Sequence, residues 1–397
     1  MSVFGKALIA GVMIVAPSIG LVAVAQAQPP IRIGTSVAQT GTLATSSQTQ
    51  LRGYQLCVKH MNDKGGVLGR KLELVVYDDG GEPATAVRLY EKLITQDKVD
   101  LVLGPFGLPA TDAVADVTEK YKLPMVALAA STSFYTKGRK FIFSMIPAAE
   151  VYLEGLFDLA AKKGLKTVAL VKRDDLFGRA VTQGAIELAK KKGLQVVFVD
   201  AYPRGTTDFS TLLTEVRAAN PDVLGGGMPF EDAVAITRQL KALSVNPRMV
   251  GLMVGVALLK FHEVLGRDAE FVYSATHWTP ELVEVRAGGL IPIARQYPGA
   301  REFVESYKKE FPGDTPPAAG YGACQILVEA IRRAGSLDSE KLRDAISKMD
   351  HNTVFGGFRV DRDGVQIARK MLLTQWQDGK RVIVTFDHFR SVGGGLG

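Results

Sequence analysis

Short apolar strands alternate with amphipathic helices over most of this 397-residue chain. Such alternation is typical of a parallel sheet that is covered by helices on both faces. The first strand is expected at Ile31–Val37, followed by a polar loop at Gln39–Gln48 and a helix from about Gln50 to Asn62. The next elements are expected at Leu72–Asp78, Val99–Leu103 and Pro124–Leu128 (strands) and at Pro83–Gln96 and Ala110–Tyr121 (helices). The sequence therefore predicts an α/β fold.

The pattern restarts near residue 150, which indicates two related lobes. The motifs of Asp100–Val126 recur in the same order in Asp222–Val250, offset by 122 residues at the strand and by 124 at the end. A chain of this length is also expected to form two domains. The second copy is expected to contain helices at Val151–Lys163, Gly178–Lys192, Phe209–Ala219 and Glu231–Leu243, and strands at Thr167–Val171, Gln195–Tyr202, Asp222–Gly226 and Arg248–Met253.

The last hundred residues depart from this alternation. Three helices are expected at Tyr297–Phe311, Ala318–Ala334 and Ser339–Met349. An antiparallel appendix is expected after them, and Asp378-Gly379 is a good two-residue hairpin turn. The appendix comprises Phe358–Asp361, the turn Arg362-Asp363-Gly364, and strands at Met371–Gln377 and Arg381–Phe386.

Residues 1–27 have the pattern of a cleavable signal peptide. Lys6 precedes an apolar run from Ala7 to Val24, and small residues at Ala25 and Ala27 suit signal peptidase. The alternative is a membrane anchor, but Pro17 and the adjacent cleavage pattern disfavour it. We expect cleavage after Ala27. Since no cysteine is available there for a lipid anchor, a periplasmic product of a Gram-negative cell is expected.

The net charge of +7 falls to +6 without Lys6. The sequence contains no basic run interleaved with aromatic residues, so no nucleic-acid partner is expected. The two cysteines, Cys57 and Cys324, each lie in an apolar helical run. Export permits a disulfide between them, but the sequence alone does not show whether they lie close together in the fold. Buried free thiols are therefore expected, with a bridge as the alternative.

Motifs of enzymes and cofactor sites are missing from the sequence. It has no GxGxxG after the first strand, no GxxxxGK[ST] and no GxSxG. The histidines are dispersed without metal-ligand spacing, and His277 is expected to make a contact between domains, with a ligand contact as the alternative. The segment Asp361–Gly364 lacks the later ligands of a calcium loop. No enzyme activity, cofactor or metal is expected.

Glycines and hydroxyl side chains gather where four predicted strands end. In open parallel sheets, ligands bind beyond the carboxyl ends of the strands, where helix N-termini offer unpaired N–H groups. We therefore expect ligand contacts from these segments, which are Gly104–Leu108, Ala129–Ser133, Gly225–Phe230 and Gly251–Gly255.

The segment Asn62–Asp79, with its Lys64-Gly65-Gly66 and Gly69-Arg70-Lys71 motifs, resembles the type I periplasmic solute-binding proteins of the leucine/isoleucine/valine-binding family. Asp174–Gly178 and Asp208–Ser210 are similar to two further motifs of that family. The resemblance runs over nearly the whole chain after residue 30. It implies two Rossmann-like lobes, a hinge of three crossings, an interlobe cleft, and a monomeric receptor for the inner-membrane permease of an ABC importer.

The resemblance also implies a division of the chain and its crossings. The N-terminal lobe is expected to contain residues 28–145 plus 275–355, and the C-terminal lobe residues 146–274 plus 356–397. The crossings are expected near Ser144–Pro147, Tyr273–His277 and Thr353–Phe358.

Ligand positions are carried over from the family one by one. Ala129 and Ser131 resemble its carbonyl-plus-hydroxyl pair, and Phe177 resembles its aromatic wall. Two positions depart, since Leu108 stands for a carboxylate-binding serine and Met253 for an ammonium-binding glutamate. An unpaired ammonium in an apolar cleft costs several kcal/mol, so an apolar or aromatic carboxylate is favoured over an amino acid. The full candidate set is Ser46, Phe106, Gly107, Leu108, Ala129, Ser131, Phe177, Phe230 and Met253.

Three classes of function are compatible with this fold. A transport receptor is favoured. A sensory or regulatory binding protein of the same fold is the second class, disfavoured by the predicted signal peptide and by the lack of a fused module. A periplasmic enzyme is the third, and it would need a catalytic constellation that the sequence does not offer.

Overall fold

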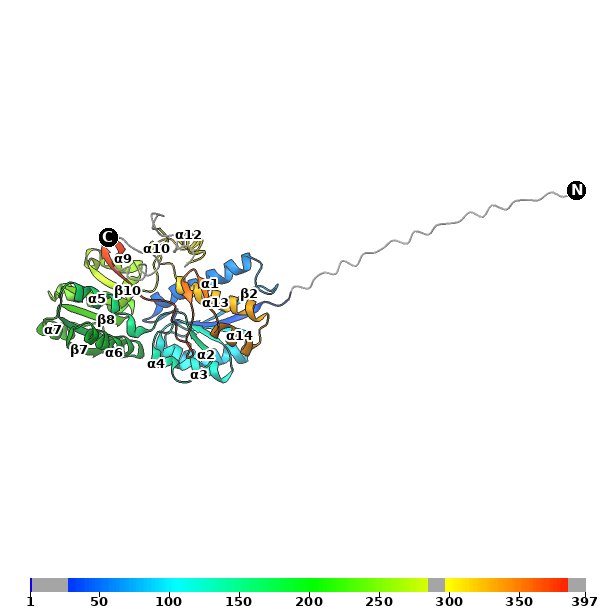
Figure 1. Ribbon diagram of the computed structural model, residues 1–397, viewed down its shortest axis with the longest axis horizontal. Helices are drawn as coiled ribbons and strands as arrows, with labels where there is room; N and C mark the ends of the chain where they lie inside the picture. Colours follow the sequence, from blue (N-terminus) through cyan, green and yellow to red (C-terminus); the bar gives the residue numbers. More distant parts are fainter. Residues whose placement is uncertain (2–27, 285–296, 385–397) are drawn as a thin grey trace.

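Two separate sheets, each covered by helices, form the body of the protein in the computed structural model (Figure 1). The structure describes residues 1, 28–284 and 297–384. The predicted signal peptide, apart from Met1, and the end of the last predicted strand lie outside the described residues. No helix in the described part of the chain is long and apolar enough to span a membrane.

The first sheet has five parallel strands in the order β2-β1-β3-β4-β5. The register pairs Ile31 with Leu72 and Ile33 with Leu101, so β1 lies between β2 and β3. The strands are β1 (Ile31–Val37), β2 (Leu72–Asp78), β3 (Leu101–Leu103), β4 (Met125–Ala127) and β5 (Ile142–Ser144). The helices that connect or follow them are α1 (Ala44–Asp63), α2 (Pro83–Thr95), α3 (Leu108–Lys120) and α4 (Thr132–Tyr135).

The second sheet has seven strands in the order β14-β13-β10-β9-β8-β6-β7. Its strands are β6 (Thr167–Arg173), β7 (Gln195–Tyr202), β8 (Val223–Met228), β9 (Met249–Val254), β10 (Val272–Thr276), β13 (Leu372–Gln377) and β14 (Lys380–Ile383). The first five run parallel, whereas β13 is antiparallel to both β10 and β14. Its helices are η1 (Ala149–Val151), α5 (Glu154–Lys162), α6 (Leu176–Lys191), α7 (Ser210–Ala219), α8 (Phe230–Ala242), η2 (Gly255–Ala257), α9 (Leu259–Leu265) and η3 (Gly266–Ala269).

The remaining elements lie between β10 and β13 in the sequence. Helix α13, drawn in orange in Figure 1, packs along α1, and α14 packs on α13. A two-stranded antiparallel ribbon follows these helices. These elements are α10 (Glu281–Glu284), α12 (Ala300–Glu310), α13 (Ala318–Ala334), α14 (Ser339–Ser347), β11 (His351–Thr353) and β12 (Gly356–Phe358).

The α/β class and the two sheets confirm the fold prediction, but some local predictions were wrong. The polar segment Gln39–Gln48 was expected to be a loop, yet α1 begins at Ala44. Its small polar residues favour turns in isolation, but Ser47 and Gln50 are buried in the folded protein, so tertiary packing overrides that preference. Phe358 was expected in the antiparallel appendix, but it pairs with His351 of β11. The strand β5 and the short helices α4 and α9 were not predicted.

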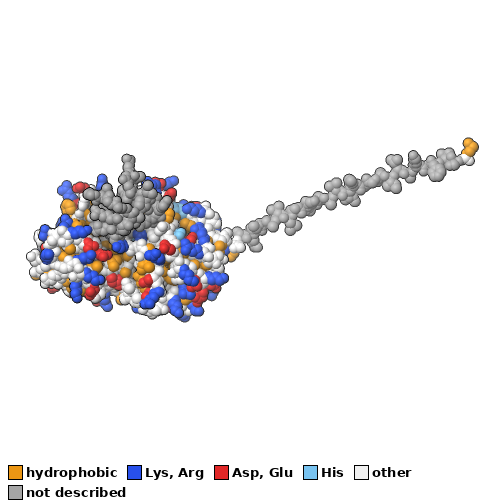
Figure 2. Space-filling view, viewed as in Figure 1, with side chains coloured by type: hydrophobic (Ala, Val, Ile, Leu, Met, Phe, Trp, Pro, Cys, Tyr) orange, Lys and Arg blue, Asp and Glu red, His pale blue; other side chains and the backbone are white. Residues whose placement is uncertain are grey.

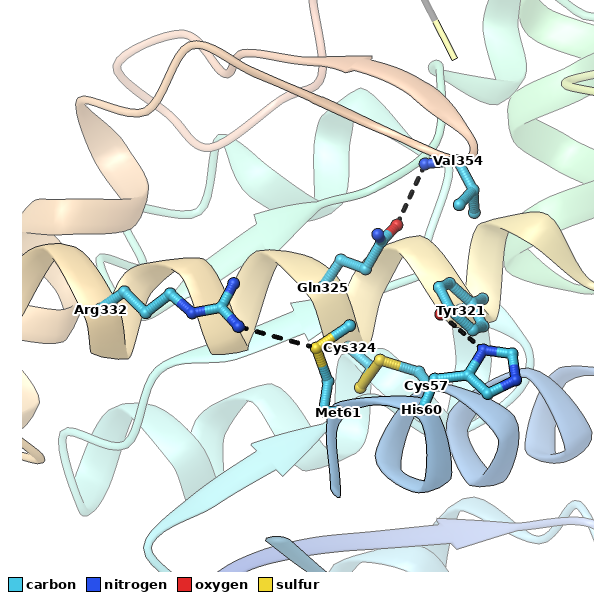
Figure 3. The surroundings of a disulfide bond; sticks show 8 residues. All are labelled: Cys57, His60, Met61, Tyr321, Cys324, Gln325, Arg332 and Val354. Carbon is cyan, nitrogen blue, oxygen red and sulfur yellow. Dashed lines mark hydrogen bonds between the residues drawn. A yellow bond between two sulfur atoms is a disulfide. The ribbon is translucent and has the colours of Figure 1, made fainter. Parts of the chain in front are cut away.

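The expectation of two free thiols was also wrong. Cys57 of α1 and Cys324 of α13 form a disulfide, with an S–S distance of 2.07 Å and a Cα–Cα distance of 6.2 Å (Figure 3). Both cysteines are fully buried between the two helices. Because 267 residues separate them in the sequence, only the packing of α13 on α1 brings them together.

The visible surface is mixed in charge. Figure 2 shows lysine and arginine side chains interspersed with aspartate and glutamate side chains over the described part of that face. The positive net charge is therefore not gathered into one basic patch on this view of the molecule.

Candidate ligand-binding site

The loops after the strands of the two sheets meet each other. Arg204, just after β7, forms an ion pair of 3.0 Å with Glu82, which lies between β2 and α2. Helix α3, which follows β3, contacts α6, which follows β6. Since each of these segments follows the carboxyl end of a parallel strand, the carboxyl ends of the two sheets face each other. We call the set of loops and helix starts at these ends the strand-tip interface.

On the first-sheet side, Ser131 and Ala129 are enclosed and hydrogen-bonded. The Ser131 hydroxyl oxygen lies 2.8 Å from that of Ser133, and only 2% of Ser131 is exposed. The Ala129 carbonyl accepts hydrogen bonds from the hydroxyls of Tyr135 (2.8 Å) and Ser144 (3.0 Å). This carbonyl is therefore occupied by the protein itself, whereas a hydroxyl like that of Ser131 can both donate and accept.

The start of α3 lies at the tip of β3 and has no side-chain cap. Gly107 precedes it with φ of 87°, a left-handed conformation that suits glycine. The first turn of α3 contains no acidic residue, whereas Asp175 caps α6 by accepting a hydrogen bond of 2.8 Å from Gly178 N–H. Partly buried Phe106 precedes Gly107, but the side chain of Leu108 packs into the core cluster of the first sheet. An uncapped helix start favours an anionic partner.

On the second-sheet side, Phe177 reaches the first sheet. This partly buried ring packs against the core cluster that contains Leu108 and Ala129. It also makes an edge contact with Tyr152, with ring centroids 5.7 Å apart. The cluster that Phe177 contacts thus includes two predicted site residues of the first sheet, Leu108 and Ala129.

Phe230 lies in a core cluster of the second sheet, whereas Met253 lies in the core cluster that also contains Leu103 and Val126 of the first sheet. Phe230 starts α8, is 6% exposed, and has the Lys260 ammonium 5.9 Å from its ring centroid. Met253 is fully buried, and its sulfur accepts a hydrogen bond of 2.7 Å from Ala275 N–H.

Two unpaired polar groups on α1 were missed by the sequence interpretation. The Ser47 hydroxyl and the Gln50 side-chain carbonyl are buried without a hydrogen-bond partner. The Gln50 amide donates to the Gly104 carbonyl (3.2 Å) at the end of β3, so Gln50 lies beside the strand tip. Ser46, which was predicted, is buried on the same helix. The polar composition of Gln39–Gln48 predicted a loop. The sequence signal that could have placed these side chains on a helix is the helical pattern that starts at Ala44.

The segment after the first predicted crossing carries a further missed group. Glu150 accepts a hydrogen bond of 3.0 Å from Thr132 N–H through Oε1, while its Oε2 is buried without a partner. Burial and, secondarily, the Glu150 charge raise the pKa of the Tyr152 hydroxyl well above its usual value. Because Thr132 follows Ser131, this carboxylate lies at the tip of β4.

His277 lies in the second predicted crossing and forms hydrogen bonds with residues that follow the other two crossings. Its Nε2 lies 2.6 Å from the Tyr152 hydroxyl, and its carbonyl accepts a hydrogen bond from Arg369. Burial, with a smaller effect of the Arg369 charge, lowers the pKa of the His277 imidazole to about 3. The ring is therefore neutral at physiological pH. This contact is of the structural kind that the sequence favoured over ligand binding.

Two surface cavities lie away from the candidate residues. One of about 350 Å³ is lined by residues that include Arg139, Arg343 and Arg362. Another of about 390 Å³ lies beside the disulfide and is lined by residues that include His60 and Tyr321. Neither cavity is lined by a member of the candidate set. Among residues 28–284 and 297–384, no group of three or more His, Cys, Asp or Glu side chains could hold a metal ion.

Comparison with known proteins identifies the family. A model of the periplasmic binding protein family matches residues 30–381. The chain belongs to this family. A Leu/Ile/Val-binding protein homologue of Brucella melitensis is 27% identical, and the match covers 92% of this chain and 93% of the relative. This confirms the resemblance to the type I leucine-binding group.

Solved structures of periplasmic binding proteins have the same fold. The leucine-binding protein LivK of Thermotoga maritima superimposes with a TM-score of 0.79 at 25% identity, covering 89% of this chain and 98% of that one. A solute-binding protein of an ABC transporter from Rhodopseudomonas palustris BisB5, solved with 3,4-dihydroxybenzoic acid, gives 0.77 at 24% identity, covering 90% and 96%.

Membership of this family fixes the general role. Periplasmic binding proteins of this type are solute-binding proteins of ABC transporters, not enzymes, and they work with membrane permeases. The family name implies a periplasmic or extracellular location.

Proposed function

We propose that this protein captures a small aromatic or apolar carboxylate at the strand-tip interface and delivers it to an ABC importer of the inner membrane. The observation that carries the proposal is the packing of Phe177, from the second sheet, against the core cluster of the first sheet, which includes Leu108 at the uncapped start of α3 and Ala129 after β4. An aromatic wall next to an uncapped helix start suits a ligand with an apolar body and an anionic end.

An apolar residue at the carboxyl end of β9 favours a carboxylate ligand without an amino group over a free amino acid. At the position of the family's acidic residue, Met253 is fully buried and offers only a thioether that already accepts from Ala275 N–H. An ammonium group there would lose its hydration without gaining a counter-ion, which costs several kcal/mol. Leucine, the ligand named for the LivK neighbour, is therefore the weaker candidate.

We propose the candidate set Ser46, Phe106, Gly107, Leu108, Ala129, Ser131, Phe177, Phe230 and Met253 as the lining of the site. The proposed lobes are residues 28–145 plus 275–355 and residues 146–274 plus 356–397. Ligand binding favours the closed arrangement because only that arrangement offers contacts from both lobes.

A thermal-shift screen of the purified protein, followed by calorimetry, tests the ligand class. We expect benzoate-type acids to bind with micromolar affinity and leucine to bind more weakly. Phe177→Ala is expected to lower the affinity about tenfold or more, since it removes the aromatic wall, while Phe271→Ala at an exposed position serves as the control. Micromolar leucine binding with no response to aromatic acids would refute the proposed ligand class.

The alternative functions are separated by different measurements. X-ray scattering should detect compaction on ligand binding, with the ligand recovered unchanged. Turnover of the ligand would favour an enzyme. Normal uptake of the ligand by cells that lack this protein, together with altered gene expression, would favour a sensory protein.

A further inference from the structure

The Glu150 carboxylate has one oxygen committed to the protein and one left free. Oε1 accepts a hydrogen bond of 3.0 Å from Thr132 N–H of the first lobe. Oε2 is buried and has no hydrogen-bond partner. Buried polar atoms are nearly always hydrogen-bonded, so a free carboxylate oxygen in an enclosed place points to a donor that the chain itself does not provide.

The Glu150 carboxylate takes part in none of the ion pairs formed between the described residues, and its hydrogen-bond donor is the Thr132 N–H. A buried carboxylate oxygen without a donor has lost its hydration and gains no hydrogen bond in return, which is unfavourable. The free energy of the protein would therefore fall if an O–H or N–H group approached Oε2.

The surroundings of Glu150 place it at the strand-tip interface. The peptide N–H that it binds follows Ser131 directly, and Tyr152, two residues after Glu150, makes an edge contact with Phe177. The backbone of Glu150 lies against Gly184 of α6, so closely that a Cβ on Gly184 would stand 2.1 Å from the Glu150 carbonyl oxygen. This packing leaves little freedom to the backbone that carries the carboxylate.

We infer that Glu150 is a specificity-determining residue that accepts a hydrogen bond from an O–H or N–H group on the ligand. The inference rests on the proposed function and deepens it: the preferred ligand is an aromatic carboxylate that carries a hydroxyl group. The ligand's carboxylate lies at the start of α3, and its hydroxyl donates to Glu150 Oε2. A single hydroxyl matches the single free oxygen.

Matched ligand pairs test this inference by calorimetry. The first pair is 4-hydroxybenzoate and benzoate, and the second is leucine and 4-methylpentanoate, so each pair differs in one donor group. We expect the hydroxylated acid to bind about tenfold to a hundredfold more tightly than benzoate, as hydrogen bonds to charged groups do. In Glu150→Gln this advantage should fall to about threefold or less, while benzoate binding stays the same or improves. The glutamine retains an acceptor for Thr132 N–H.

Glu154→Gln, four residues further along the chain, is the matched control and should keep the full advantage of the hydroxylated acid. Thermal unfolding of both variants checks that they fold. If benzoate binds but the hydroxyl adds nothing, or if Glu150→Gln keeps the advantage, the inference is overturned while the proposed function stands. If only the leucine pair binds, the proposed ligand class fails, and an amine advantage that vanishes in Glu150→Gln would still support Glu150 as the acceptor. Binding of none of the four compounds would overturn both.

Discussion

The guanidinium of Arg204 lies 3.0 Å from the carboxylate of Glu82, and this ion pair connects a loop of the seven-stranded sheet to a loop of the five-stranded sheet. Arg204 also donates to the Gly81 carbonyl, at 3.5 Å. Both ionic side chains are well exposed, at 39% and 58%. The pair therefore contributes little, because exposed ion pairs are worth about 0–1 kcal/mol.

Arg204→Ala is expected to lower ligand affinity by about fivefold or less at low salt, since the pair exists only when the two loops meet. Near 1 M salt the variant and the wild type should bind alike, because screening removes the contribution of an exposed pair. The double charge swap Glu82→Arg/Arg204→Glu should restore the affinity. A loss of a hundredfold, independent of salt, would contradict this account.

The disulfide between Cys57 and Cys324 should contribute to stability and not to binding. It closes a very long loop and lies between α1 and α13, away from the strand tips. We expect the double variant Cys57→Ala/Cys324→Ala to lose about 2–5 kcal/mol of unfolding free energy, measured by urea denaturation. Ligand affinity measured well below the unfolding midpoint should be unchanged. Reductant in the denaturation buffer should weaken the wild type and leave the variant unaffected.

The architecture could be predicted from the sequence because alternation and strand-end chemistry are local signals. Each strand of the two sheets up to Met249–Val254, apart from β5, was expected within a few residues of its observed bounds. The three-residue strand β5 offers too short an apolar run to be told from a loop. The early start of α1 was missed because its first residues are helical through burial against the rest of the fold, and turn propensity points the other way.

The candidate site could be predicted only in part. Phe177 was predicted through a motif, and the structure packs it against the core cluster that contains Leu108 and Ala129. Glu150 belongs to no sequence motif, so the sequence did not predict it as a site residue. It became a candidate because its Oε2 is buried without a hydrogen-bond partner, which only the folded structure shows. The disulfide could not be predicted from the sequence either, because it depends on a contact between helices that are far apart in the chain.

His277 should make stability depend on pH. Its folded pKa of about 3 lies below the ordinary value of 6.5, so the unfolded chain binds the proton more tightly. The stabilisation by the neutral ring is thus complete above about pH 6.5 and is lost as the pH falls toward 3. In His277→Gln, the loss of unfolding free energy between pH 7 and pH 4 should be smaller than in the wild type by about 1–3 kcal/mol. Urea denaturation at both pH values measures this difference, and equal losses in the two proteins would contradict the assignment.

Gly184→Ala should destabilise the protein although it lies inside α6. In an ordinary helix interior, alanine in place of glycine stabilises by about 1 kcal/mol. Here the new Cβ would stand 2.1 Å from the Glu150 carbonyl oxygen and 2.3 Å from its Cα, so η1 must move away from α6. We expect a net loss of about 1–3 kcal/mol of unfolding free energy, measured by urea denaturation, as for overpacking in a core.

Because the same movement displaces the Glu150 carboxylate, the affinity advantage of a hydroxylated ligand over its parent acid should shrink as well in Gly184→Ala. Gln183→Ala, at the exposed neighbouring position, should change neither quantity. A Gly184→Ala protein that is more stable than the wild type, with unchanged ligand preference, would mean that the packing of η1 on α6 does not hold Glu150 in place.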